Sequence, residues 1–145
     1  MSDVVGIARK YLNTSYHSGA KIKGTGIDCG WLLIAVYEDA GLLPIGECDP
    51  GYYSNEWHLH RSEEKYLGWI EKYCDVVEGD PLPGDIALFK FGRCVSHGGI
   101  ITEWPYIIHA YVGMGVLVSS IKESLLCDKN GDSRLYGIYR VRQVT

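Results

Sequence analysis

The sequence predicts one α+β domain, with helices packed on a single antiparallel sheet of about five strands. Apolar residues recur at helical spacing in the first half of the chain, and short β-type segments separated by turn residues fill the second half. The length of 145 residues suits one ordinary domain, so residues 1–145 are assigned to a single unit. Apolar residues at 46% and charged residues at 22% are typical of a globular chain.

The first half is predicted to contain two helices joined by a glycine-rich loop. Apolar residues from Val4 to Leu12 follow a helical stripe, and residues 14–27 form the loop. Asp28 suits the N-cap of the second helix, and Gly41 suits the left-handed position beyond its last turn. The first residue of that helix is then a cysteine, the only one of five at a predicted helix N-terminus.

The second half begins after an aromatic loop near residues 50–53 and a helix around residues 62–73. A Pro-Gly-Asp turn at residues 83–85 precedes the change to β-type periodicity. We expect the strands that follow to form an antiparallel meander. The candidate strands are residues 86–91, 98–103, 106–111, 115–119 and 137–142.

Charge and hydropathy exclude several classes of function. With 14 Lys and Arg against 18 Asp and Glu, the formal charge of −4 provides no basic surface for nucleic acid or an anionic membrane. No apolar stretch approaches the roughly 18 to 20 residues of a membrane helix, so no membrane insertion is expected. The N-terminus lacks the layout of a signal peptide, which predicts synthesis in the cytoplasm and transport by another route. No Cys-x-x-Cys pair supports a zinc or redox site.

The residues with the chemistry of a catalytic site are one cysteine and two histidines. A thiol attacks carbonyl carbon as the thiolate, which a helix N-terminus and a neighbouring imidazole both favour. Cys29 has the first of these by position. A turn near residues 104–105 makes His97 and His109 diagonal neighbours, about 7–8 Å apart at the backbone. We expect the Cys29 sulfur to lie against the His97 imidazole, although these residues alone also allow purely structural roles.

Four motifs occur in order along the chain: residues 26–31, 82–89, 96–101 and 107–110. They comprise an Asp-Cys helix start, a Pro-Gly-Asp turn and two histidines on neighbouring strands. Together they resemble the NlpC-type, papain-like cysteine peptidases of bacterial cell walls. Residues 57–67 are similar to a segment of the phage-tail and gene-transfer-agent branch of that family.

The resemblance implies a papain-like fold with the nucleophile at the N-terminus of the central helix. It implies that Cys29 is the nucleophile, His97 the general base, and His109 the group that orients His97. The hydroxyl of Tyr16, together with the backbone N–H of Cys29, would hold the oxyanion. No metal or organic cofactor is required by this chemistry.

The resemblance also implies a substrate-binding surface around the nucleophile. The family usually has serine and then glycine after the cysteine, whereas this chain has Gly30 and Trp31. The missing hydroxyl cannot make the contact that the serine makes, so substrate preference is less well defined than the chemistry. The residues expected to form the oxyanion and substrate region are Tyr16, Asp28, Gly30, Trp31 and Gly98.

The implied function is hydrolysis of an amide bond in peptidoglycan stem peptides, commonly the bond between D-glutamate and diaminopimelate. A phage or prophage tail component that acts on the cell wall, with other tail proteins as partners, fits the missing signal peptide. The alternatives are a thiol amidase or acyltransferase on a non-wall substrate, a toxin-type wall amidase exported by a dedicated machine, and a catalytically idle module for tail assembly or binding.

Two further patterns are interpreted as structural. Residues 128–132 begin like a calcium loop, but the twelfth position is Tyr139 and not glutamate, which favours a surface turn. His58 and His60 could chelate a metal from an extended segment, but no third ligand is evident.

Overall fold

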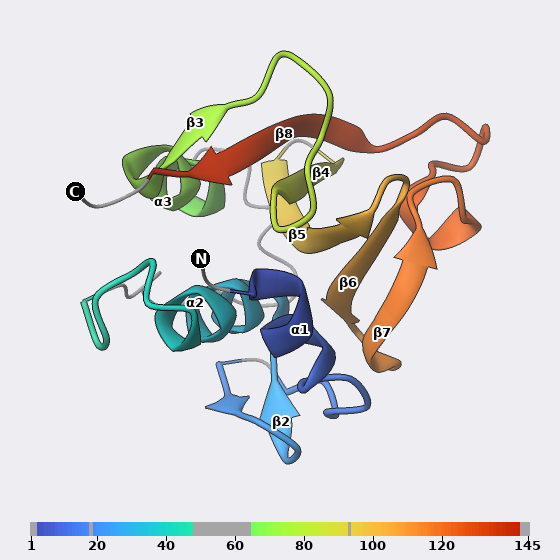
Figure 1. Cartoon of the computed structure of the whole chain (residues 1–145). Coiled ribbons are helices and arrows are strands. Elements are labelled where there is room, and N and C mark those ends of the chain that lie inside the picture. The colour runs from blue at the N-terminus through green and yellow to red at the C-terminus, as the bar shows by residue number, and fades with distance from the viewer. Residues whose placement is uncertain (1–2, 18, 48–64, 93, 143–145) are drawn as a thin grey trace.

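A computed structural model describes residues 3–17, 19–47, 65–92 and 94–142. In this part of the chain, six antiparallel strands form one sheet in the order β3-β8-β4-β5-β6-β7. The helices pack on it, which confirms the predicted α+β class (Figure 1). The strands are β3 (Cys74–Val76), β4 (Ile86–Phe91), β5 (Cys94–Glu103), β6 (Tyr106–Tyr111), β7 (Gly115–Ser120) and β8 (Leu135–Val141).

The remaining elements are α1 (Val4–Arg9), α2 (Cys29–Asp39), α3 (Lys65–Tyr73), the 3₁₀ turn η2 (Ser124–Leu126), and the two short strands β1 (Lys21–Ile22) and β2 (Gly26–Ile27). The expected aromatic loop near residues 50–53 lies outside the described residues. No described helix is long and apolar enough to cross a membrane.

Three features of the topology differ from the prediction. The sheet contains β3 as an additional strand, which has only three residues and no alternating pattern to reveal it. The meander is limited to β4–β7, because β8 returns to pair between β3 and β4. The glycine-rich loop contains the antiparallel pair β1 and β2, two residues each.

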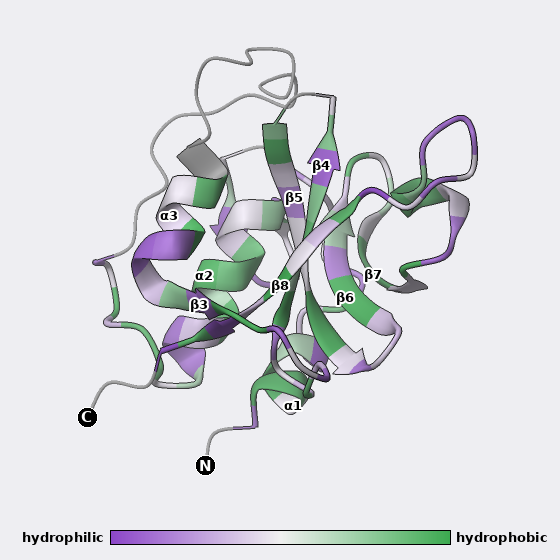
Figure 2. Ribbon diagram, turned by 90° about the horizontal axis from the view of Figure 1, so that it is seen from above, coloured by the Kyte–Doolittle hydropathy of each residue, from purple (hydrophilic) through white to green (hydrophobic). Residues whose placement is uncertain are grey.

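The central helix α2 begins and ends where its capping residues predict. The side chain of Asp28 accepts a hydrogen bond from the Trp31 N–H, and Gly41 has φ of +76° just past the helix. Most of its side chains are buried, so the helix is hydrophobic on nearly all sides, as expected of a core helix. Figure 2 shows this helix as mostly hydrophobic and beside the sheet.

The two faces of the sheet bury different cores. Along β4, Ile86 and Leu88 pack in the cluster that contains α1 and α2. The alternate residues Ala87 and Phe89 pack on the other face with Leu126 of η2. Both faces are therefore covered, by helices on one side and by the segment around η2 on the other.

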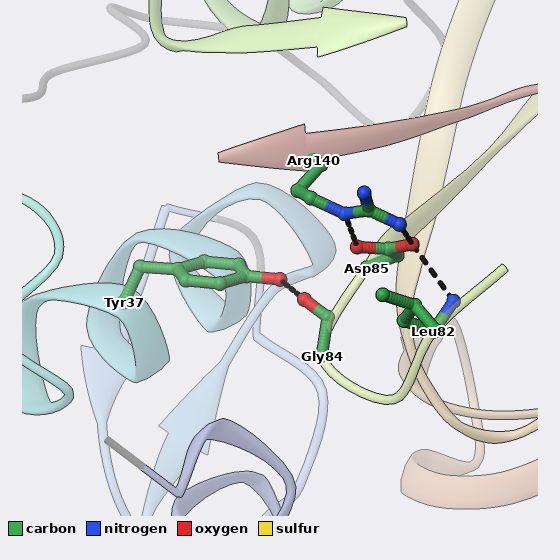
Figure 3. Close-up of polar contacts among 5 residues, drawn as sticks. All are labelled: Tyr37, Leu82, Gly84, Asp85 and Arg140. Carbon is green, nitrogen blue, oxygen red and sulfur yellow. Dashed lines mark hydrogen bonds and ion pairs between the residues drawn. The ribbon is translucent and has the colours of Figure 1, made fainter. Parts of the chain in front are cut away.

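The Pro-Gly-Asp turn fastens the start of β4 to α2 and β8 (Figure 3). Gly84 has φ of +93°, and its carbonyl accepts a hydrogen bond from the Tyr37 hydroxyl on α2. The buried Asp85 carboxylate accepts hydrogen bonds from Arg140 Nε and Nη2, both at 2.8 Å, and from the Leu82 N–H at 2.9 Å. An ion pair between the buried Asp85 carboxylate and the half-exposed Arg140 guanidinium thus links the start of β4 to β8.

The edge strand β7 is held by the segment that leads into the candidate site. The Val116 N–H donates to the Thr14 carbonyl, and the Val116 carbonyl accepts from the Asn13 N–H. Gly115 has φ of +80°, and a Cβ there would lie 2.5 Å from the Thr14 oxygen. Glycine is required at this close approach. The contact sets the path of the backbone into Tyr16.

Candidate active site

Two buried histidines on adjacent strands hydrogen-bond to each other. His97 on β5 and His109 on β6 are joined through His97 Nε2 and His109 Nδ1 at 2.8 Å. The pairing of Ile100 with Ile108 sets the register that makes them diagonal neighbours, as the turn near residue 104 predicts. Gly99 makes room for the pair, because a Cβ there would lie 3.1 Å from the Cβ of His109.

Burial keeps both imidazoles uncharged at neutral pH. Desolvation lowers the pKa of His97 well below its usual 6.5, and the proximity of His109 lowers it further. Desolvation also lowers the pKa of His109 to about 4. Each ring therefore carries one proton, and one of the two facing nitrogens donates while the other accepts. A neutral imidazole is the form that can act as a general base.

Sequence reasoning missed Ser119, the third member of this hydrogen-bonded chain. Its buried hydroxyl lies 2.8 Å from His109 Nε2. Because His109 pairs with Leu117 across β6 and β7, Ser119 is again a diagonal neighbour. A residue two positions from the direct cross-strand partner is a diagonal neighbour, as for the two histidines. The same reasoning, applied across the turn between β6 and β7, could have predicted Ser119.

The Cys29 sulfur lies at the N-terminus of α2 and contacts β5. Its Sγ donates to the Ser96 carbonyl at 3.6 Å. Ser96 is the extra residue of a β-bulge, because Phe89 pairs with His97 while Lys90 pairs with Val95. The bulge presents the carbonyl that precedes the histidine to the helix terminus.

Sulfur and imidazole approach this bulge from different sides. Cys29 belongs to the core on the helix side of the sheet. The His97 ring packs with its centroid 5.9 Å from those of Phe89 and Phe91, which belong to the core on the other face. The Tyr111 ring also packs against His97, with 5.7 Å between the two ring centroids. The structure thus places the sulfur against the residue before His97, and direct contact between sulfur and imidazole stays a prediction.

Tyr16 lies beside Cys29. Its hydroxyl is a hydrogen-bonding neighbour of the Cys29 sulfur, and a bridge to Ile27 holds its backbone next to the start of α2. Burial raises the pKa of Tyr16, and the nearby Cys29 and Asp28 raise it further. The hydroxyl therefore remains protonated and is available as an O–H donor.

Three of the other four predicted site residues, Asp28, Gly30 and Trp31, form the start of α2. Asp28 is fully buried, and its Oδ1 and Oδ2 accept hydrogen bonds from the Trp31 N–H at 2.9 Å and the Gly19 N–H at 2.6 Å. Its role here is to fix the backbone. Gly30 is buried, and the half-buried Trp31 carries the Lys21 ammonium 5.2 Å from its ring centroid.

Gly98, the remaining residue of that set, is buried on β5 and pairs with Leu88 of β4. It lies inside the sheet beside His97.

The described part of the chain contains no cluster of three or more His, Cys, Asp or Glu side chains able to hold a metal ion. His58 and His60 lie outside the described residues. The Asp128 carboxylate accepts hydrogen bonds from the N–H groups of Asn130 and Asp132, at 2.8 and 3.0 Å, which is a local turn.

The described residues form a mixed α+β domain, and solved structures of NlpC/p60 proteins share this fold. The NlpC/p60 domain of the peptidoglycan hydrolase SagA superposes with a TM-score of 0.55 at 22% identity, over 82% of this chain and 87% of that domain. NlpC1 from Trichomonas vaginalis gives 0.63 at 18% identity, over 95% of this chain and 42% of that one.

A protein similar to lipoprotein of the NLP/P60 family, from Staphylococcus aureus, gives a TM-score of 0.62 at 20% identity, over 96% of this chain and 40% of that one. This chain therefore spans about two fifths of the length of the Trichomonas and Staphylococcus proteins. No family model and no curated protein sequence matches the chain.

Proposed function

We propose that this domain is a cysteine peptidase that cleaves an amide bond in the stem peptides of peptidoglycan. One observation carries the proposal: a buried His97–His109 pair at 2.8 Å lies next to a bulge whose carbonyl receives the Cys29 thiol. This is the set of groups that nucleophilic thiol catalysis needs. The likeness to the domain of a peptidoglycan hydrolase supports the substrate class.

The first step requires the Cys29 sulfur and the His97 imidazole to come into contact. The thiol then gives its proton to Nδ1 of His97, since Nε2 of that ring is engaged by His109. The thiolate attacks the carbonyl carbon of the substrate and forms a tetrahedral intermediate. Its oxyanion accepts hydrogen bonds from the Tyr16 hydroxyl and the Cys29 N–H. Collapse of the intermediate breaks the C–N bond, and His97 protonates the leaving amine.

In the second step, His97 takes a proton from water as the water attacks the thioester. The acid product leaves, and the thiol of Cys29 is restored when the proton returns to sulfur. His97 must be uncharged at the start of each half-reaction, which its lowered pKa provides at neutral pH.

The finer assignments belong to the same proposal. The bond between D-glutamate and diaminopimelate is the proposed point of cleavage, and Gly30 with Trp31 would shape the subsite in place of the family's Ser-Gly pair. The proposed setting is a phage or prophage tail that brings the domain to the cell wall. Residues 57–67, which carry that part of the resemblance, lie outside the described residues.

The test is digestion of purified muropeptides, with the products identified by mass spectrometry. We expect cleavage by the unaltered protein, none by Cys29→Ala, and full cleavage by the matched variant Cys127→Ala, whose half-exposed thiol lies elsewhere. Added amines distinguish hydrolysis from acyl transfer, because a transferase yields products with the mass of the amine. Intact muropeptides with the unaltered protein would contradict the proposed substrate.

A further inference from the structure

The His97–His109 pair can hold its protons in two arrangements, and only one leaves a lone pair on His97 Nδ1, the nitrogen that His109 does not engage. In the first, His97 Nε2–H donates to His109 Nδ1, which leaves the lone pair on His97 Nδ1. In the second, His109 Nδ1–H donates to His97 Nε2, so the single proton of neutral His97 sits on Nδ1. Because both rings are neutral, the 2.8 Å hydrogen bond fits either arrangement.

The nitrogen that decides between these arrangements is His109 Nε2, at the far end of the pair. In the base-competent arrangement this nitrogen carries a proton and requires an acceptor. A buried N–H group without an acceptor is rare in folded proteins, because it loses its hydrogen bonds to water without replacement. His109 is fully buried, and the Ser119 hydroxyl oxygen lies within hydrogen-bond distance of this nitrogen.

We propose that Ser119 is the positioning residue that makes the base-competent arrangement possible, by accepting the His109 Nε2 proton on its hydroxyl oxygen, whereas an apolar side chain there would leave this proton without an acceptor. This assignment rests on the proposed thiol chemistry. Ser119 Oγ lies 2.8 Å from Nε2 and is itself buried, with 1% of the residue exposed. It acts through His109 and His97, without contact with the nucleophile or the substrate.

The chain of hydrogen bonds also supports the charged intermediate. When His97 receives the thiol proton, its Nε2–H polarises His109, and the positive charge is shared along the path to Ser119. Hydrogen bonds in series strengthen one another in a low-dielectric interior. Loss of the terminal acceptor therefore weakens the base and the imidazolium that forms from it.

The first test is ¹⁵N NMR of the histidine side chains, which distinguishes protonated from unprotonated ring nitrogens. In the unaltered protein at pH 7, we expect His109 to be protonated at Nε2 and unprotonated at Nδ1. The reverse pattern would overturn the proposal. In Ser119→Ala, we expect the proton to shift toward Nδ1 of His109.

The second test follows the alkylation of Cys29 by iodoacetamide as a function of pH. We expect Ser119→Ala to slow alkylation at pH 7 roughly tenfold, the factor that one unsatisfied buried donor contributes. Ser119→Thr, which keeps the hydroxyl, should restore the rate. The control is Ser120→Ala, whose hydroxyl accepts from the Lys122 N–H and does not contact a histidine.

Neither measurement requires peptidoglycan, so their outcome is separate from the choice of substrate. A Ser119→Ala protein with lower thermal stability but an unchanged alkylation profile would assign Ser119 a purely structural role and overturn the proposal. The expected NMR and alkylation results combined with intact muropeptides would retain Ser119 as a positioning residue and reject the peptidoglycan substrate alone.

Discussion

The fold keeps the two histidines of the candidate site uncharged at neutral pH. Their aromatic and aliphatic surroundings remove water, and the pKa of His109 falls to about 4 for that reason alone. This burial makes the folding stability sensitive to acid, because the unfolded chain binds a proton at these histidines that the folded chain does not bind. An imidazole with ordinary exposure would be half protonated near pH 6.5, where it could no longer accept the thiol proton.

Acid sensitivity should decrease when His109 is replaced by a group that does not titrate. Between pH 6.5 and about 4 the unfolded state binds a proton at His109 that the folded state lacks, so the free energy of unfolding falls as the pH drops through this window. The full contribution is of order 3 kcal/mol. Denaturant titrations from pH 7 to 4.5 should show a shallower decline for His109→Asn. Equal slopes in the two proteins would contradict neutral burial of His109.

Gly99 of β5, which faces the His109 strand β6, should be irreplaceable for activity. In Gly99→Ala the new Cβ would lie 2.8 Å from Ile107 Cδ1 and 3.0 Å from the Ile108 carbonyl oxygen, which forces β5 and β6 apart. We expect a loss of about 1–3 kcal/mol in stability, together with slower alkylation of Cys29. The control is Gly137→Ala, whose Cβ would meet Tyr139 at an ordinary 3.4 Å. Normal alkylation in Gly99→Ala would show that the histidine pair tolerates this displacement.

At the scale of elements, most boundaries could be predicted from local signals. The Asp28 cap, the Gly41 stop and the strands β4 and β6 follow from residue types and periodicity, and the structure confirms them. Strand β3 and the β1–β2 pair could not be predicted, since two or three residues are too few for an alternating pattern. They form because neighbours distant in sequence supply their hydrogen bonds.

The Pro-Gly-Asp turn makes a second prediction at this scale. Asp85→Asn removes the charge that binds Arg140 in a site where the carboxylate is 3% exposed. Because the Arg140 side chain is 46% exposed, we expect the free energy of unfolding to fall by about 1.5–3 kcal/mol, the range for hydrogen bonds to a charged group. Asp75→Asn is the matched control, because this carboxylate also pairs with an arginine but is 70% exposed. Its loss should cost less than about 1 kcal/mol. Equal losses of unfolding free energy in the two variants, measured by urea titration, would show that burial of the carboxylate does not strengthen the ion pair.

At the scale of the whole molecule, the site forms where three distant segments meet. The loop that contains Tyr16, the N-terminus of α2 and the start of β5 converge at the Ser96 bulge. The histidine spacing and the helix cap predict Cys29, His97 and His109 as site residues, whereas Tyr16 is implied by the family resemblance alone. The sequence could not predict the bulge, because a bulge depends on how two strands pair and leaves no local pattern in either. The sides from which Cys29 and His97 approach it are therefore structural findings.

The most direct test of the whole account compares the alkylation of Cys29 and Cys127 at pH 7, read peptide by peptide with mass spectrometry. Cys29 is 4% exposed and Cys127 is half-buried, so accessibility alone would make Cys127 the faster thiol. We expect Cys29 to react faster, because a helix N-terminus and a neutral imidazole assist it, and His97→Ala to slow Cys29 at least tenfold without changing Cys127. Faster reaction of Cys127, or a Cys29 rate that His97→Ala leaves unchanged, would contradict the central role of this pair.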